Sequence, residues 1–106
     1  MFAYPDDPSG LSNEEVEAGF ARLQAMSQAI EAKRLVWLAE LERRKTYRRD
    51  GFLSPSAWLS DRFGVSASEA KTQIGVATAL RQMPDVRRAF IRGEVTSSAV
   101  RVLVDA

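Results

Sequence analysis

Apolar residues recur at helical spacing through the first half of the chain. Steps of three, four and seven positions are typical of one face of an amphipathic helix. Ser12 followed by Glu15 is the sequence pattern of a capping box, and from there to Gly51 only Gly19 interrupts the run. We therefore predict one long helix over residues 12–49. Its apolar face comprises Val16, Phe20, Leu23, Met26, Ile30, Trp37 and Leu41, and it is widened by Leu35 and Leu38.

The first eleven residues have a different character. Pro5, Pro8 and Gly10 are residues that interrupt regular secondary structure. We predict a flexible leader over residues 1–11 and assign it no function.

Short helices separated by turn residues are predicted for residues 52–106. Ser54 and Pro55 are a cap and a first-turn residue, and Gly64 ends the helix that they begin. Ser66 begins a second helix, which runs from about residue 67 to 82 because Pro84 prevents its continuation.

Two further helices complete the pattern. Asp85 is expected to cap a short basic helix over residues 86–92, which Gly93 ends. Thr96 or Ser97 can then cap a final helix; valines at positions 100, 102 and 104 alternate as in a strand, but we favour a helix. The whole pattern predicts an all-α fold. Residues 12–106 form a single helical domain, in which the long helix packs against three or four short ones.

The apolar face of the long helix needs a cover. Either the later helices fold back over it, or a second copy of the chain pairs with it. The seven-residue spacing of Val16, Leu23, Ile30 and Trp37 suits a coiled-coil-like homodimer, and both possibilities stay open. Trp37 and Trp58 lie among apolar neighbours, so we interpret both as core residues rather than as platforms for stacked bases.

Residues 54–80 have the organisation of a helix-turn-helix. The first helix ends at Gly64 and the second begins within three or four residues, so the two can cross over a small shared core. Gly75, inside the second helix, indicates a close crossing with another helix. The shared core is predicted to comprise Leu59, Phe63, Val65, Ala70, Ile74 and Ala77.

The second helix of this corner carries polar side chains on its outer face. Gln bonds adenine, Lys reaches guanine or phosphate, and Ser and Thr bond either base type. The predicted contacts to base edges are Ser68, Lys71, Thr72 and Gln73. The alternative is the ordinary polar face of a capped surface helix, and Glu69 would repel phosphate in a groove.

Charge is distributed unevenly along the chain. The net charge is +1, but residues 1–42 hold eight acidic and three basic residues, whereas residues 43–106 hold six acidic and twelve basic ones. Five basic residues lie between positions 43 and 49, at the end of the long helix, and we call them the basic run. Cations complement the carbonyl groups at a helix end, but five are more than this role requires, so we predict contacts to DNA phosphates. A merely solvated basic surface is the alternative. The candidates are Arg43, Arg44, Lys45, Arg48, Arg49, Arg87, Arg88 and Arg92, with Arg101 beyond them.

The chain contains no histidine and no cysteine. HNH nucleases, most metal hydrolases and Ser-His-Asp enzymes need an imidazole, and the acidic residues show no paired arrangement for acid–base catalysis. We therefore expect no enzymatic activity in this chain, no metal ion or other cofactor, and no small-molecule substrate. The acidic N-terminus and the short apolar runs predict neither export nor a membrane span, and hence a cytoplasmic protein.

Two classes of function remain. The favoured one is a non-catalytic module that binds duplex DNA through its basic surface and the helix-turn-helix. The other is a protein-interaction module, in which the long helix drives dimerisation or docks a partner such as a nuclease domain.

Residues 51–100 resemble a known family. The signs are Gly51 and Ser54 before Ala57-Trp58-Leu59, Gly64 with Ser66 and Ala70, then Ala77, Leu80, Pro84 and Gly93. Together with the preceding segment AIEAKRLVWLAELERR they are similar to the domain of unknown function 222, which typically precedes an HNH endonuclease domain in actinobacterial proteins. The resemblance covers about residues 22–106 and implies an all-helical N-terminal module. It supplies no molecular function and no catalytic residues. The sequence stops at Ala106, before any nuclease, which leaves open a fragment of a longer protein, a stand-alone regulator and a shortened relative.

Overall fold

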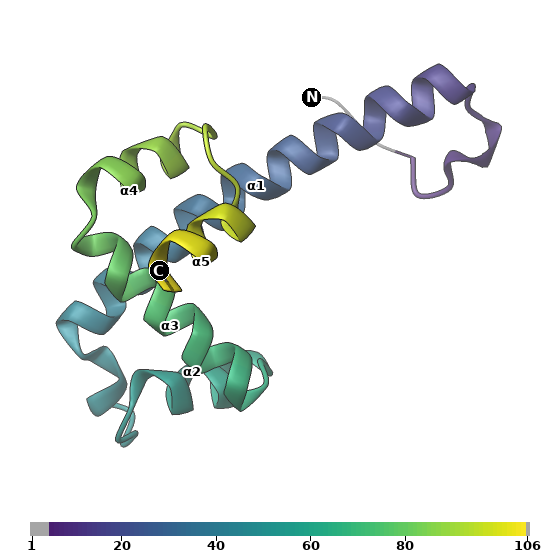
Figure 1. Ribbon diagram of the computed structural model, residues 1–106. Coiled ribbons are helices and arrows are strands. Elements are labelled where there is room, and N and C mark those ends of the chain that lie inside the picture. The colour runs from purple at the N-terminus through teal and green to yellow at the C-terminus, as the bar shows by residue number, and fades with distance from the viewer. Residues whose placement is uncertain (1–4, 106) are drawn as a thin grey trace.

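The computed structural model describes residues 5–105, and they form the all-α fold that the sequence predicts (Figure 1). No strand occurs within that range. Two short 3-10 turns accompany the helices, η1 (Pro8–Gly10) and η2 (Thr46–Arg48). The helices are α1 (Asn13–Arg44), α2 (Pro55–Phe63), α3 (Ala67–Arg81), α4 (Pro84–Ile91) and α5 (Ser97–Asp105).

The long helix begins where the capping box predicts. The Ser12 hydroxyl accepts a hydrogen bond from the Glu15 backbone N–H at 3.1 Å, and the Glu15 carboxylate accepts one from the Ser12 N–H at 3.0 Å. The predicted end at residue 49 was wrong, because α1 stops at Arg44. Lys45 takes a left-handed backbone conformation with φ of 55°, which turns the chain and buries Tyr47 beside the helix end.

Only the second half of α1 is covered by later helices. Four of its residues are buried in the core, namely Ala32, Leu35, Leu38 and Ala39. The first half projects away from the other helices (Figure 1). Its apolar side chains are exposed, namely Val16, Phe20, Leu23, Met26 and Ile30. The possibility that folded-back helices cover the whole face is therefore wrong for these positions.

The central element of the fold is α3, which contacts each of the other four α-helices. Ala70 and Ala77 are fully buried, and their small side chains let neighbouring helices approach closely. Phe90 from α4 and Val100 from α5 complete the same core. The other α-helices are therefore arranged around α3.

The corner between α2 and α3 has the predicted helices on both sides. Gly64 ends α2 with φ of 68°, a conformation that favours glycine. The hydroxyl of Ser66 then accepts the Glu69 backbone N–H at 3.2 Å and starts α3. Phe63 was wrongly assigned to the shared core, because its side chain is 65% exposed. Its ring instead meets Trp58 edge-on, with centroids 5.5 Å apart.

Two other local predictions were also wrong. A Cβ atom placed on Gly75 would meet no atom within 4 Å, so no close helix crossing occurs there. Asp85 does not cap α4, because Pro84 already occupies the first turn of that helix and the Asp85 carboxylate pairs with Arg88.

The two ends of the described chain are simple. The Thr96 hydroxyl accepts the Ala99 N–H at 3.1 Å, which starts α5 as a helix rather than a strand. In the leader, Asp7 accepts the Ser9 N–H at 3.0 Å and η1 follows, while residues 1–4 of the predicted leader lie outside the described range. Between residues 5 and 105, no helix has the length and apolarity needed to cross a membrane.

Candidate functional site

An ion pair fixes the end of α1 against α3. The Arg81 guanidinium donates to the Glu42 carboxylate at 3.0 Å and to the Ala39 carbonyl at 3.2 Å. This contact joins the last turns of the two helices. The basic residues that follow Glu42 are consequently held next to the start of α4.

The first two arginines of the basic run share one acidic partner. Glu40 accepts from Arg43 at 2.6 Å and from Arg44 at 2.7 Å. These hydrogen bonds, Arg43 contributing most, lower the pKa of Glu40 from 4.5 to about 2. Glu40 therefore stays ionised at neutral pH and neutralises part of the charge. Lys45 lies 4.0 Å from Glu42, at the limit of an ion pair.

Arg48 and Arg49 differ from the first two arginines of the run in their contacts. Arg48 lies over the ring of the buried Tyr47, with its guanidinium carbon 5.9 Å from the ring centre. Arg49 is exposed. Within residues 5–105, no carboxylate forms an ion pair with Arg48 or Arg49.

Three predicted phosphate contacts converge on one surface hollow. Arg44 comes from α1, Arg49 from the turn after η2, and Arg87 from α4. Glu40 and the side chain of Trp37 line the same hollow, whose volume is about 580 Å³. We call it the basic hollow. Its lining contains three arginines against one carboxylate, so it carries a net positive charge.

The remaining predicted phosphate contacts lie outside the basic hollow. Arg43 is held by Glu40, Arg88 is paired with Asp85, and Arg92 is exposed at the end of α4. Helical spacing could have revealed part of the hollow, since Trp37, Glu40 and Arg44 follow one another at steps of three and four. No sequence signal places Arg87 beside them, because that contact is tertiary.

The predicted base-edge contacts lie at the other end of α3. Ser68, Lys71 and Thr72 are exposed in its first turns, and the Thr72 hydroxyl donates to the Ser68 carbonyl at 3.1 Å. Gln73 was wrongly placed on the outer face. It is half-buried, its amide nitrogen donates to Glu69 at 3.2 Å, and its amide oxygen is buried without a partner among the described residues.

The Glu69 carboxylate is also engaged in contacts within the fold. Arg101 of α5 donates to its carboxylate at 2.7 Å. The hydrogen bond from Arg101, followed by that from Gln73, lowers the pKa of Glu69. Its negative charge is thus paired within the fold, which reduces the repulsion that Glu69 would exert on a phosphate.

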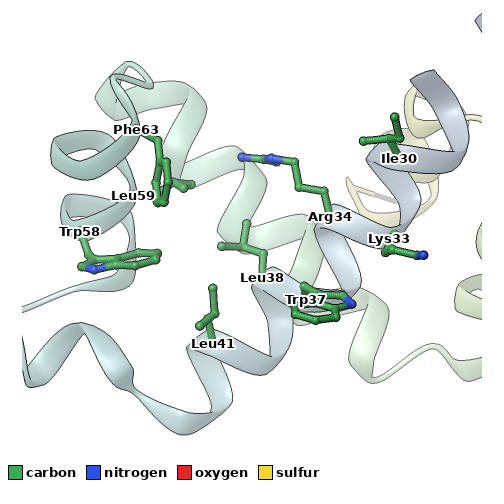
Figure 2. A pocket seen from close by; sticks show the side chains of 9 residues that line it. All are labelled: Ile30, Lys33, Arg34, Trp37, Leu38, Leu41, Trp58, Leu59 and Phe63. Carbon is green, nitrogen blue, oxygen red and sulfur yellow. The ribbon is translucent and has the colours of Figure 1, made fainter. Parts of the chain in front are cut away.

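An apolar groove of about 420 Å³ lies on the other side of Trp37, between α1 and α2. Figure 2 shows Trp58 and Phe63 facing Leu41 across it, while Lys33 points away. The assignment of Trp37 to the core was wrong, because its side chain is 69% exposed. Trp58 does pack against the core, and its ring N–H donates to Asp50 at 2.9 Å.

Residues 5–105 contain no group of three or more side chains that could hold a metal ion.

The fold and the hollow define a class: an all-helical domain arranged around one central helix, with a basic hollow at its surface. Within that class, the chain matches the family described as Domain of unknown function (DUF222) over residues 13–106, and it belongs to that family. The resemblance drawn from the sequence is thereby confirmed. No curated protein and no solved structure matches the chain.

Proposed function

We propose that this domain binds duplex DNA without catalysis, by contacts to the backbone phosphates. The observation that carries the proposal is the convergence of Arg44, Arg49 and Arg87 from three separate elements on one hollow. Arginine presents planar donors that match phosphate oxygens, and such contacts hold a protein on DNA whatever its sequence.

The rest of the basic run extends this surface. Arg48 directly precedes Arg49 and forms no ion pair with a carboxylate of the described chain. On α3, Ser68, Lys71 and Thr72 are exposed and supply secondary contacts to a groove. Gln73 contributes least, because its amide is engaged with Glu69.

Salt dependence of duplex binding tests the proposal. Each phosphate contact contributes roughly −0.9 to the slope of log affinity against log salt. Arg49→Ala combined with Arg87→Ala should therefore reduce the slope by about 1.8 and weaken binding at least about tenfold.

The control is Lys33→Ala, which removes a cation that lies on α1 but outside the basic hollow. It should leave the slope almost unchanged. Equal effects of the control and of the arginine changes, or no binding to duplex DNA at low salt, would refute the proposal.

A second candidate function is self-association through α1. The exposed apolar side chains on its projecting half favour it, because exposed faces of this kind mark interaction sites. In an antiparallel pair, the acidic start of α1 in one copy lies opposite the later cations of α1 in the other, and the opposite charges attract. The acidic residues are Glu14, Glu15 and Glu17, and the cations are Lys33 and Arg34. We propose a second copy of this chain as the partner.

Sedimentation at rising protein concentration tests the second candidate. The mass should increase toward twice that of the chain, and Phe20→Glu should hold it at the monomer value because a charge would be buried in the interface. Ala21→Glu adds the same charge at an exposed position outside the apolar face and serves as the control for fold. A monomer at every concentration would exclude self-association.

A further inference from the structure

Trp37 is a large aromatic side chain that the fold leaves exposed. Tryptophan usually buries most of its large ring, yet this side chain is 69% exposed in the second half of α1. It lies between the apolar groove and the basic hollow and lines both. Neither packing nor a capping role accounts for a ring left in this place.

The basic hollow combines aromatic, aliphatic and cationic side chains. An aromatic ring and two aliphatic side chains, Val36 and Leu41, lie beside Arg44, Arg49 and Arg87. Proteins that hold single-stranded nucleic acid combine these parts, since bases stack on aromatic rings while cations follow the phosphates. The volume of about 580 Å³ lies in the range of cavities that accept a small organic group.

We propose that the basic hollow binds single-stranded nucleic acid, with one unpaired base stacked on the indole of Trp37 and the adjacent phosphates held by Arg44, Arg49 and Arg87. This inference rests on the phosphate contacts of the proposed function and adds the base. In a duplex both faces of each base are covered by its neighbours, so only an unpaired base offers a free face to the ring. Duplex DNA would use the same arginines without contacting Trp37.

Three ligands of equal length separate the possibilities. A fluorescently labelled oligothymidine offers phosphates and bases, an abasic strand offers phosphates alone, and a duplex offers phosphates with covered bases. Their affinities are measured by fluorescence anisotropy at low salt with the full chain, with Trp37→Ala and with Trp37→Phe. Circular dichroism checks that each variant keeps its helices, which is expected because Trp37 lies outside the core.

Trp37→Ala should weaken oligothymidine binding at least about fivefold, in line with the loss of one stacked base. Trp37→Phe should recover most of the loss, and the affinities for the abasic strand and the duplex should not change. In a Trp58→Phe background Trp37 is the single tryptophan of the chain. Its fluorescence should then be quenched by oligothymidine and not by the abasic strand.

The outcomes also separate this inference from the proposed function. If all three ligands bind with the salt dependence of phosphate contacts but Trp37→Ala affects none of them, the inference is overturned and the proposed function stands. If none of the ligands binds, both are overturned. If Trp37 is quenched by a second copy of the chain in the absence of nucleic acid, the ring belongs to a protein interface and the inference is again overturned.

Discussion

Glu40 forms ion pairs with two of the five cations of the basic run. It is the acidic residue that lines the basic hollow, and it bonds both Arg43 and Arg44. Its pKa in the folded chain is about 2, below the ordinary 4.5. A lowered pKa means that ionised Glu40 stabilises the fold above about pH 4.5, and that this contribution is lost as the pH falls toward about 2.

Glu40→Gln should therefore reduce the pH dependence of the free energy of unfolding in this acid range. Denaturant unfolding between about pH 5 and about pH 2, roughly the range spanned by the two pKa values, measures it. Glu17→Gln makes the same change of charge on the same helix, at an exposed position away from the arginines. Equal loss of pH dependence in the two variants would show that the lowered pKa of Glu40 is not its source.

Two glycines should respond to the same substitution in opposite ways. Gly75 has space for a Cβ atom inside α3, so Gly75→Ala should raise the free energy of unfolding by about 0.5–1 kcal/mol. Gly64 also has space, but its φ of 68° strains any L side chain. Gly64→Ala should lower the free energy of unfolding by about 1–2 kcal/mol. Thermal unfolding of both variants measures the contrast.

At the scale of elements, α1 is one helix with two environments. Its first half projects from the other helices and its second half lies in the core. Capping, and not packing, sets where the helix starts, whereas contacts with α3 hold its second half. The two halves should therefore differ in how they support the fold.

Matched leucine truncations test this difference. Leu38→Ala removes a side chain that is 5% exposed and should lower the free energy of unfolding by about 2–5 kcal/mol. Leu23→Ala changes a side chain that is 46% exposed and should cost less than about 0.5 kcal/mol in the monomer. Equilibrium unfolding in urea at low protein concentration compares them, and similar costs would show that the first half is also packed.

At the scale of the whole molecule, the projecting helix gives an elongated shape. The chain measures 50 × 30 × 25 Å, with a radius of gyration of 16.7 Å over its Cα atoms. A compact chain of this length would have a radius of about 13 Å. The core thus occupies one end of the molecule, and the exposed half of α1 extends from it.

Small-angle X-ray scattering should reproduce this shape. At low protein concentration the radius of gyration should be near the value of 16.7 Å, slightly enlarged by side chains and hydration. A value close to that of a compact chain would show that the first half of α1 folds back in solution. Mass from the same data distinguishes an elongated monomer from a pair of chains.

The helices could be predicted from the sequence because capping and turn residues mark their ends. The hydroxyls of Ser12, Ser54 and Ser66 each cap a helix at the predicted place, and Gly64 and Pro84 separate the short helices. The end of α1 was missed by five residues because a left-handed Lys45 has no clear sequence signal. Family membership could also be predicted from the sequence, because the resemblance lies in this same pattern of caps, turns and apolar positions.

The sequence by itself therefore determined the all-α class, the starts of α1, α2, α3 and α5, and the uneven charge, since each depends on residues close together in the chain. Only the tertiary structure decided which side of α1 is buried and which basic residues meet. Trp37 and Leu38 are adjacent and both apolar, yet one is exposed and the other buried, because α3 packs on one side of α1. Arg44 and Arg87 line one hollow for the same physical reason: long-range packing of α1, α3 and α4 brings distant residues to one surface.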